Sequence, residues 1–117
     1  MTDFLFQDTH GSHIVSPGKV AQLLGLSPGD LASAAGVHQN TLTACPQSPR
    51  VQAFLRDIVN VLNEAKETFG DDELPIAWLL NEPLSAFRKK SAWELIAMGR
   101  GQDVLAYLHS YSAGFVG

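Results

Sequence analysis

The stretch that decides the fold is residues 31–42, which read LASAAGVHQNTL. Its first half is rich in alanine and favours helix, and Gly36 can end that helix by permitting a sharp turn. Val37 can pack at the turn. Leu42 can point inward and so hold a second short helix, expected over residues 38–44, in place. Because small residues let two helices cross closely, the spacing is that of a helix-turn-helix.

This spacing leaves several polar side chains free to face outward. Gln39 and Asn40 are of the types that pair bidentately with adenine, and Thr43 is expected on the same outward side. His38 stands at the start of the second helix, and Arg50 is placed to touch a phosphate. The sequence therefore predicts DNA as one partner.

Helix signals continue on both sides of the motif. Ser16-Pro17 and Ser27-Pro28 are typical helix starts, since serine caps free amides and proline suits the first helical position. Ser48-Pro49 begins the longest predicted helix, which ends at Gly70. Its apolar residues recur at steps of three and four, and they are Val51, Phe54, Leu55, Ile58, Leu62, Ala65 and Phe69.

Three further helices are expected in the remainder of the chain. The acidic run Asp71-Asp72-Glu73 suits a helix N-terminus and precedes a helix over residues 74–80. Ser91 and Glu94 have capping-box spacing and open a second helix, and a third covers residues 102–113. Trp78 and Trp93 are expected to be core anchors.

The predicted fold class is therefore all-α. We expect an N-terminal arm over residues 1–15, in which no strand pattern of credible length is evident. Residues 16–70 are expected to form a helix-turn-helix bundle with a long central helix and a dimerisation region. Residues 71–117 are expected to form a small helical domain that binds a protein partner.

Charge and composition restrict the function. Twelve acidic residues against eight Lys and Arg give a formal net charge of -4, which argues against a broad basic face for nucleic acid. The start of the chain lacks the basic region of a signal peptide, and the single cysteine, Cys45, fits a reducing compartment. We expect a cytoplasmic protein that does not enter a membrane.

The search for catalytic motifs is nearly empty. No phosphate-binding loop, dinucleotide fingerprint, nucleophile elbow or HExxH zinc motif is present. His10 and His13 have no carboxylate or thiolate neighbours at ligand spacing. We therefore expect no enzyme activity, no metal and no cofactor.

The C-terminal residues supply a stronger indication. In order, they are Ala77-Trp78-Leu79-Leu80, Pro83-Leu84, Ser91-Ala92-Trp93-Glu94-Leu95-Ile96, Gly99, Gly101 to Leu108, and Gly114-Phe115-Val116. This order and spacing resemble the toxin-binding domain of Xre/MbcA/ParS-type antitoxins. The preceding helix-turn-helix extends the resemblance toward the N-terminus. One departure is Arg88-Lys89-Lys90, where relatives often carry a glycine-containing turn.

The resemblance implies a type II antitoxin that neutralises a RES-domain toxin, an enzyme that consumes NAD or ADP-ribosylates a protein. It also implies a homodimer that represses its own operon. In this family the last residues of the antitoxin lie at the NAD cleft of the toxin, which carries over to Gly114, Phe115, Val116 and Gly117. Arg100 would add a polar contact at the rim of the cleft.

Two other classes of function stay open at this point. The chain could be a stand-alone helix-turn-helix regulator whose C-terminal half dimerises or senses a ligand. It could also be an interaction adaptor that has lost DNA binding, because Lys19 and Arg50 are the only cations in residues 16–50.

Overall fold

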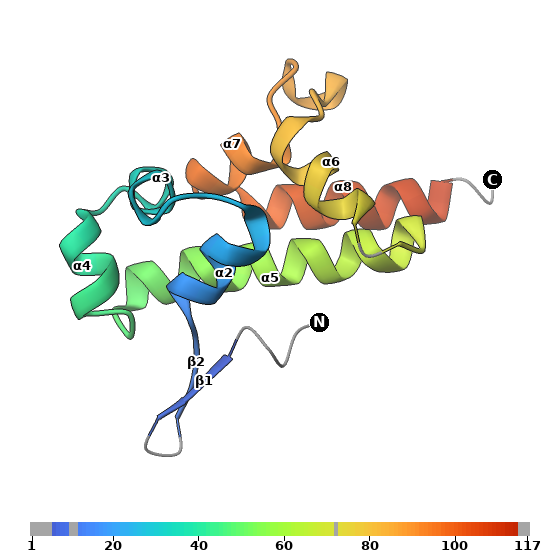
Figure 1. Cartoon of the computed structure of the whole chain (residues 1–117). Coiled ribbons are helices and arrows are strands. Elements are labelled where there is room, and N and C mark those ends of the chain that lie inside the picture. Colours follow the sequence, from blue (N-terminus) through green and yellow to red (C-terminus); the bar gives the residue numbers. More distant parts are fainter. Residues whose placement is uncertain (1–5, 10–11, 72, 115–117) are drawn as a thin grey trace. The chain divides into compact units, whose positions relative to one another are not determined.

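The computed structural model describes residues 6–9, 12–71 and 73–114, and over these residues the chain is mostly helical (Figure 1), as predicted. The elements in chain order are β1 (Phe6–Thr9), β2 (Ser12–Val15), α2 (Pro17–Leu24), α3 (Pro28–Ala35), α4 (Gln39–Ala44), α5 (Pro49–Phe69), α6 (Leu74–Asn81), the 3-10 turn η1 (Ser85–Phe87), α7 (Ala92–Ala97) and α8 (Gly101–Gly114).

The chain divides into two compact units, Met1–Arg56 and Asp57–Gly117. The division falls inside α5, whereas the sequence analysis placed a boundary after this helix. The reason is that apolar residues are buried along most of the helix, so its first part belongs to one core and its remainder to the other. We call Met1–Arg56 the first unit and Asp57–Gly117 the second unit.

Serine caps start the helices of the first unit, as the sequence indicates. The Ser16 hydroxyl accepts a hydrogen bond from the Lys19 amide at 3.3 Å, and the Ser27 hydroxyl accepts one from Asp30 at 3.1 Å. Gly36 ends α3 with a φ of 75°, a left-handed conformation that residues with a Cβ rarely adopt. Leu42 of α4 is buried, as expected.

Local signals also start the helices of the second unit. The Asp71 carboxylate accepts hydrogen bonds from the amides of Glu73 and Leu74, at the start of α6. Ser91 and Glu94 form the predicted capping box at the start of α7. The core of this unit comprises Ile58, Val59, Val61, Leu62, Ala65, Leu79, Leu84, Ala92, Leu95, Ile96, Val104 and Leu108.

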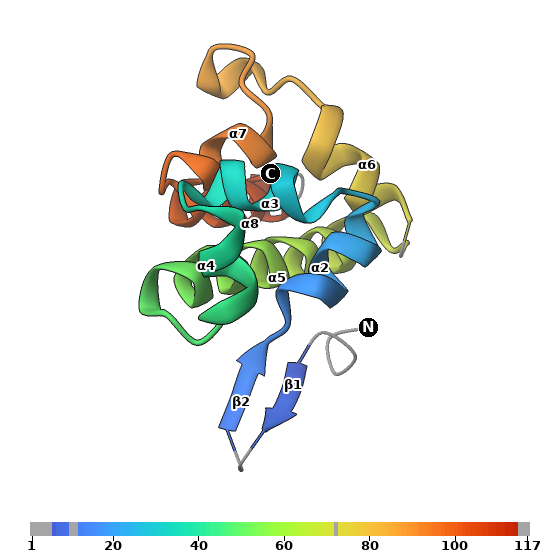
Figure 2. The ribbon, with the colours of Figure 1, turned by 60° about the vertical axis from the view of Figure 1, so that its left-hand side comes forward.

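The N-terminal segment corrects one expectation. Instead of lacking strand, β1 and β2 pair in an antiparallel hairpin, with Phe6 opposite Val15 and Thr9 opposite Ser12 (Figure 2). This register leaves two residues, His10 and Gly11, between the strands. A two-residue connection containing glycine is a hairpin signal that the short strands made easy to miss.

A buried side chain of α5 holds the end of this hairpin. The Gln52 amide group donates to the Val15 carbonyl at 2.9 Å, and its Oε1 accepts from the Val15 amide at 2.9 Å. Gln52 Nε2 also donates to the Pro46 carbonyl at 2.7 Å. The Gln52 side chain therefore pairs with both backbone groups of Val15, as a neighbouring strand would, and it also fixes the loop before α5.

In the described part of the chain, no helix has both the length and the hydropathy that crossing a membrane requires.

Replacing Gln52 by glutamate tests the role of its amide group. A carboxylate cannot donate to the Val15 and Pro46 carbonyls, so Gln52→Glu should lower the free energy of unfolding by about 2–4 kcal/mol. Urea denaturation measures this change. The exposed Gln22→Glu on α2 carries the same charge change and should stay within about 0.5 kcal/mol of the parent protein. Equal stability of the two variants would contradict the assignment.

Candidate functional site

The predicted DNA-reading residues are all exposed; four of them lie in α4 or directly before it, and Arg50 lies in α5. His38 immediately precedes the helix, and its carbonyl accepts the hydrogen bond from the Leu42 amide. Gln39, Asn40 and Thr43 share one side of α4, because residues three and four apart are neighbours on a helix surface. Leu42 of the same helix is buried. We call Gln39, Asn40 and Thr43 the α4 face.

Two members of the α4 face also make contacts within the first unit. The Thr43 hydroxyl donates to the Gln39 carbonyl at 3.2 Å and lies 3.3 Å from the Asn40 carbonyl. The Gln39 side-chain oxygen lies over Gly29, 3.4 Å from where a Cβ would stand. No side-chain hydrogen bond joins Gln39 or Asn40 to another described residue, and both side chains are exposed.

Arg50 has a structural task that the sequence analysis missed. Its Nε donates to the Ala35 carbonyl at 3.3 Å, at the end of α3. Its guanidinium covers the following turn, where a Cβ on Gly36 would approach Nη2 to 2.7 Å. Arg50 therefore holds the turn between α3 and α4, and its phosphate contact stays a prediction.

Of the predicted toxin-binding tail, the structure describes only Gly114. Phe115, Val116 and Gly117 lie outside the described residues, and Gly114 is the last residue of α8. Helix α8 is joined to α5 by His109, whose Nε2 lies 2.8 Å from Glu64 Oε1. The structure thus describes the helix that carries the tail and leaves the tail itself as a prediction.

Arg100 lies just before α8 with an exposed side chain. Its Nε lies 2.8 Å from the Asp103 carboxylate, and its guanidinium carbon lies 5.5 Å from the centre of the Phe87 ring. Such an exposed ion pair contributes little stability, so exchanging it for a partner would cost little.

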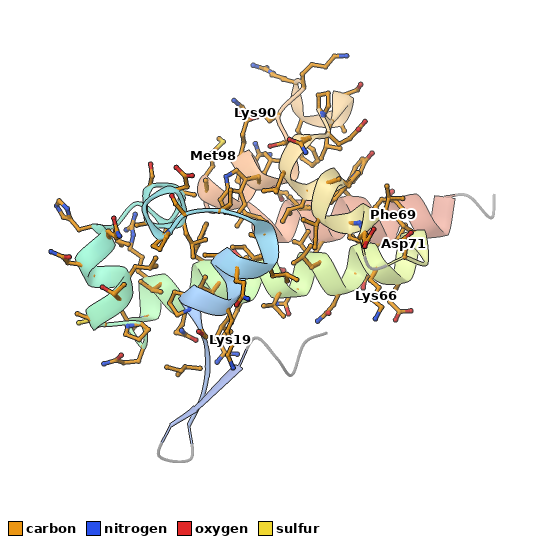
Figure 3. All side chains as sticks on the ribbon, viewed as in Figure 1. Lys19, Lys66, Phe69, Asp71, Lys90 and Met98 are labelled. Carbon is orange, nitrogen blue, oxygen red and sulfur yellow. The ribbon has the colours of Figure 1, made fainter. Side chains whose placement is uncertain are left out.

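A pocket of about 360 Å³ lies in the second unit. Its lining residues are Phe69, Trp78, Glu82, Pro83, Leu84, Ser85, Ala86, Tyr107 and Leu108. Phe69 and Trp78 meet edge to face with ring centres 5.6 Å apart, and Figure 3 shows Phe69 at the end of α5. Trp78 and Trp93 are half-buried rather than fully buried anchors, which leaves part of the Trp78 ring to line the pocket.

Sequence reasoning also missed a close approach between α5 and α8. A Cβ on Gly101 would stand 2.6 Å from the Asp57 carboxyl carbon, so this contact requires glycine. Burial raises the pKa of Asp57 above its ordinary value of 3.8. The sequence carries no local signal for this pair, because its two members are far apart along the chain.

The described residues include no candidate metal site and one cysteine. No group of three or more His, Cys, Asp or Glu side chains there could hold a metal ion. Cys45 is exposed at the C-terminal end of α4, and its thiol is free.

Comparison with protein-family models, with curated proteins and with solved structures finds no match to this chain.

The raised pKa of Asp57 leads to a pH-dependent prediction. The folded protein holds this proton more tightly than the unfolded chain, so the contribution of Asp57 to stability falls as pH rises from 3.8 through the raised value. Asp57→Asn should therefore be more stable than the parent at pH 7, with a smaller difference below pH 3.8. Urea midpoints at the two pH values measure this. Lower stability of the variant at pH 7 would instead indicate a net favourable contact of the carboxylate with the N-terminus of α8.

Proposed function

We propose that this chain is a type II antitoxin that neutralises a RES-domain toxin and represses its own operon. The first unit reads operator DNA through the α4 face, and the second unit binds the toxin. The tail Phe115-Val116-Gly117 blocks the NAD cleft of the toxin. Inhibition is steric, and the chain needs no cofactor for it.

The observation that carries the proposal is the combination of two binding features in one chain. The first unit presents exposed amide side chains on a short helix that follows a three-residue turn. The second unit is a separate compact helical body whose last helix leads directly into an apolar tail. This combination fits a protein that binds both DNA and a protein partner.

The surface of the second unit also supports a protein partner. Its pocket is lined by three aromatic side chains, Phe69, Trp78 and Tyr107, and by the carboxylate of Glu82. Tyrosine and tryptophan are enriched among the residues that dominate the binding energy of protein–protein interfaces. Leu74 is an exposed large hydrophobic residue of α6, with half of its surface in contact with solvent (52%).

The alternative, a regulator without a toxin partner, would use the α4 face in the same way. It differs in giving the tail no function. Removal of the tail therefore separates the two proposals.

Deleting residues 115–117 should abolish neutralisation. The deletion leaves α8 and its buried residues Val104 and Leu108 in place, so the melting temperature should stay unchanged. Growth of cells that express the toxin together with either chain measures the effect. Rescue of growth by the shortened chain would contradict the blocking role of the tail.

Substituting the amide side chains of the α4 face tests DNA reading. Gln39→Ala with Asn40→Ala should weaken binding to the DNA upstream of the gene by about 10-fold or more, since each lost base contact costs about 1–3 kcal/mol. The control is Gln102→Ala, which removes an exposed amide from the second unit. Fluorescence anisotropy measures both variants, and equal affinities for the operator would overturn this role of α4.

A further inference from the structure

Positive charge in the second half of the chain is concentrated at one place. Residues 71–117 contain four cations and six anions, and the cations are Arg88, Lys89, Lys90 and Arg100. We call Ser85–Lys90 the basic turn. Arg88 and Lys89 are exposed, and no ion pair joins either of them, or Lys90, to a described residue. A locally positive surface thus stands on a unit whose net charge is negative.

The backbone of the basic turn is held in a fixed, unusual conformation. Leu84 and Lys90 form an antiparallel bridge, and the amides of Phe87 and Lys89 both donate to the Leu84 carbonyl at 2.9 Å. Arg88 and Lys89 have φ values of 57° and 70°, the left-handed region that favours glycine or asparagine. Each non-glycine residue there costs about 1 kcal/mol or more. The chain therefore carries two cations where glycine would be conformationally easier.

An aromatic contact anchors the basic turn to α8. The Phe87 ring meets Tyr107 edge to face, with ring centres 5.9 Å apart, and the Arg100 guanidinium lies over the same ring. The large apolar side chain of the turn is thus directed toward α8. Figures 1 and 2 show the turn projecting beyond α7 and α8, and Figure 3 shows Lys90 at its base and nitrogen-tipped side chains extending outward.

The composition of the turn favours phosphate over a protein surface. Lysine, serine and alanine are depleted in protein–protein interfaces, and the outward residues of the turn are largely of these types. Phe87 is engaged with Tyr107 and Arg100, so it is not available to stack on an unpaired base. Closely spaced, solvated cations are instead suited to the backbone of duplex DNA.

We propose that the basic turn binds the phosphate backbone of duplex DNA, as a DNA contact in addition to that of the α4 face. This inference deepens the DNA-binding part of the proposed function. It adds to the three cations of the first unit, Lys19, Arg50 and Arg56, of which Arg50 already bonds to the Ala35 carbonyl. Because phosphate contacts do not depend on base sequence, the turn should act equally on operator and unrelated DNA.

The test is the double variant Arg88→Gly with Lys89→Gly, in the full-length chain. Glycine relieves both left-handed residues, so the melting temperature should be equal to or higher than that of the parent. Affinity for a duplex of unrelated sequence should fall at least about fivefold at low salt, and the slope of log affinity against log salt should shrink by roughly two. Operator affinity should fall by the same factor.

The matched control is Asn60→Asp with Asn81→Asp, two exposed positions of the second unit. Both double variants change the net charge from -4 to -6, one by losing two cations and the other by gaining two anions. The control should keep most of the affinity and the full salt slope. Arg88→Lys retains the charge and should behave like the parent.

Three results would overturn the proposal. The glycine variant could bind the duplex with the affinity and salt slope of the control, or the parent could fail to bind an unrelated duplex even at low salt. A polyglutamate peptide could instead bind the parent and lose affinity for the glycine variant while the duplex does not, which would assign the turn to an acidic protein surface. Unchanged operator affinity in the α4-face variant would overturn the reading role of α4, whereas the loss of duplex affinity in the glycine variant would still support the basic turn.

Discussion

The buried stripe of α5 is the constraint on which the rest of the structure depends. This helix of 21 residues has buried apolar side chains from Val51 to Ala65, and the division between the two units falls inside it. Each unit therefore builds its core partly from the same continuous helix. Interruption of that stripe would remove apolar burial from both cores at once, at a cost of about 2–5 kcal/mol for each large side chain truncated to alanine.

Much of the helical organisation could be predicted because its signals are local. Serine caps, proline at the first helical position and glycine after the last one act over three or four residues, and Ser91 with Glu94 is an example that the structure reproduces. The period of apolar residues in α5 was equally clear. At the candidate site, the exposure of Asn40 and the burial of Leu42 followed from the same periodicity.

Apart from the N-terminal hairpin, the features that the sequence did not predict depend on residues distant along the chain or on unusual backbone conformation. Gln52 binds Val15 from 37 positions away, and nothing near either residue indicates this contact. Arg50 was expected at a phosphate because it is a cation beside the motif, but the open carbonyl at the end of α3 also attracts it. The left-handed pair Arg88 and Lys89 contradicts ordinary turn preferences.

Under the proposed function, the chain inhibits an NAD-consuming partner. The most direct measurement is NAD consumption by the protein encoded by the neighbouring gene, purified and titrated with the intact chain. We predict that NAD consumption falls to background when the two proteins are present in comparable amounts. Undiminished consumption in the presence of excess chain would contradict it.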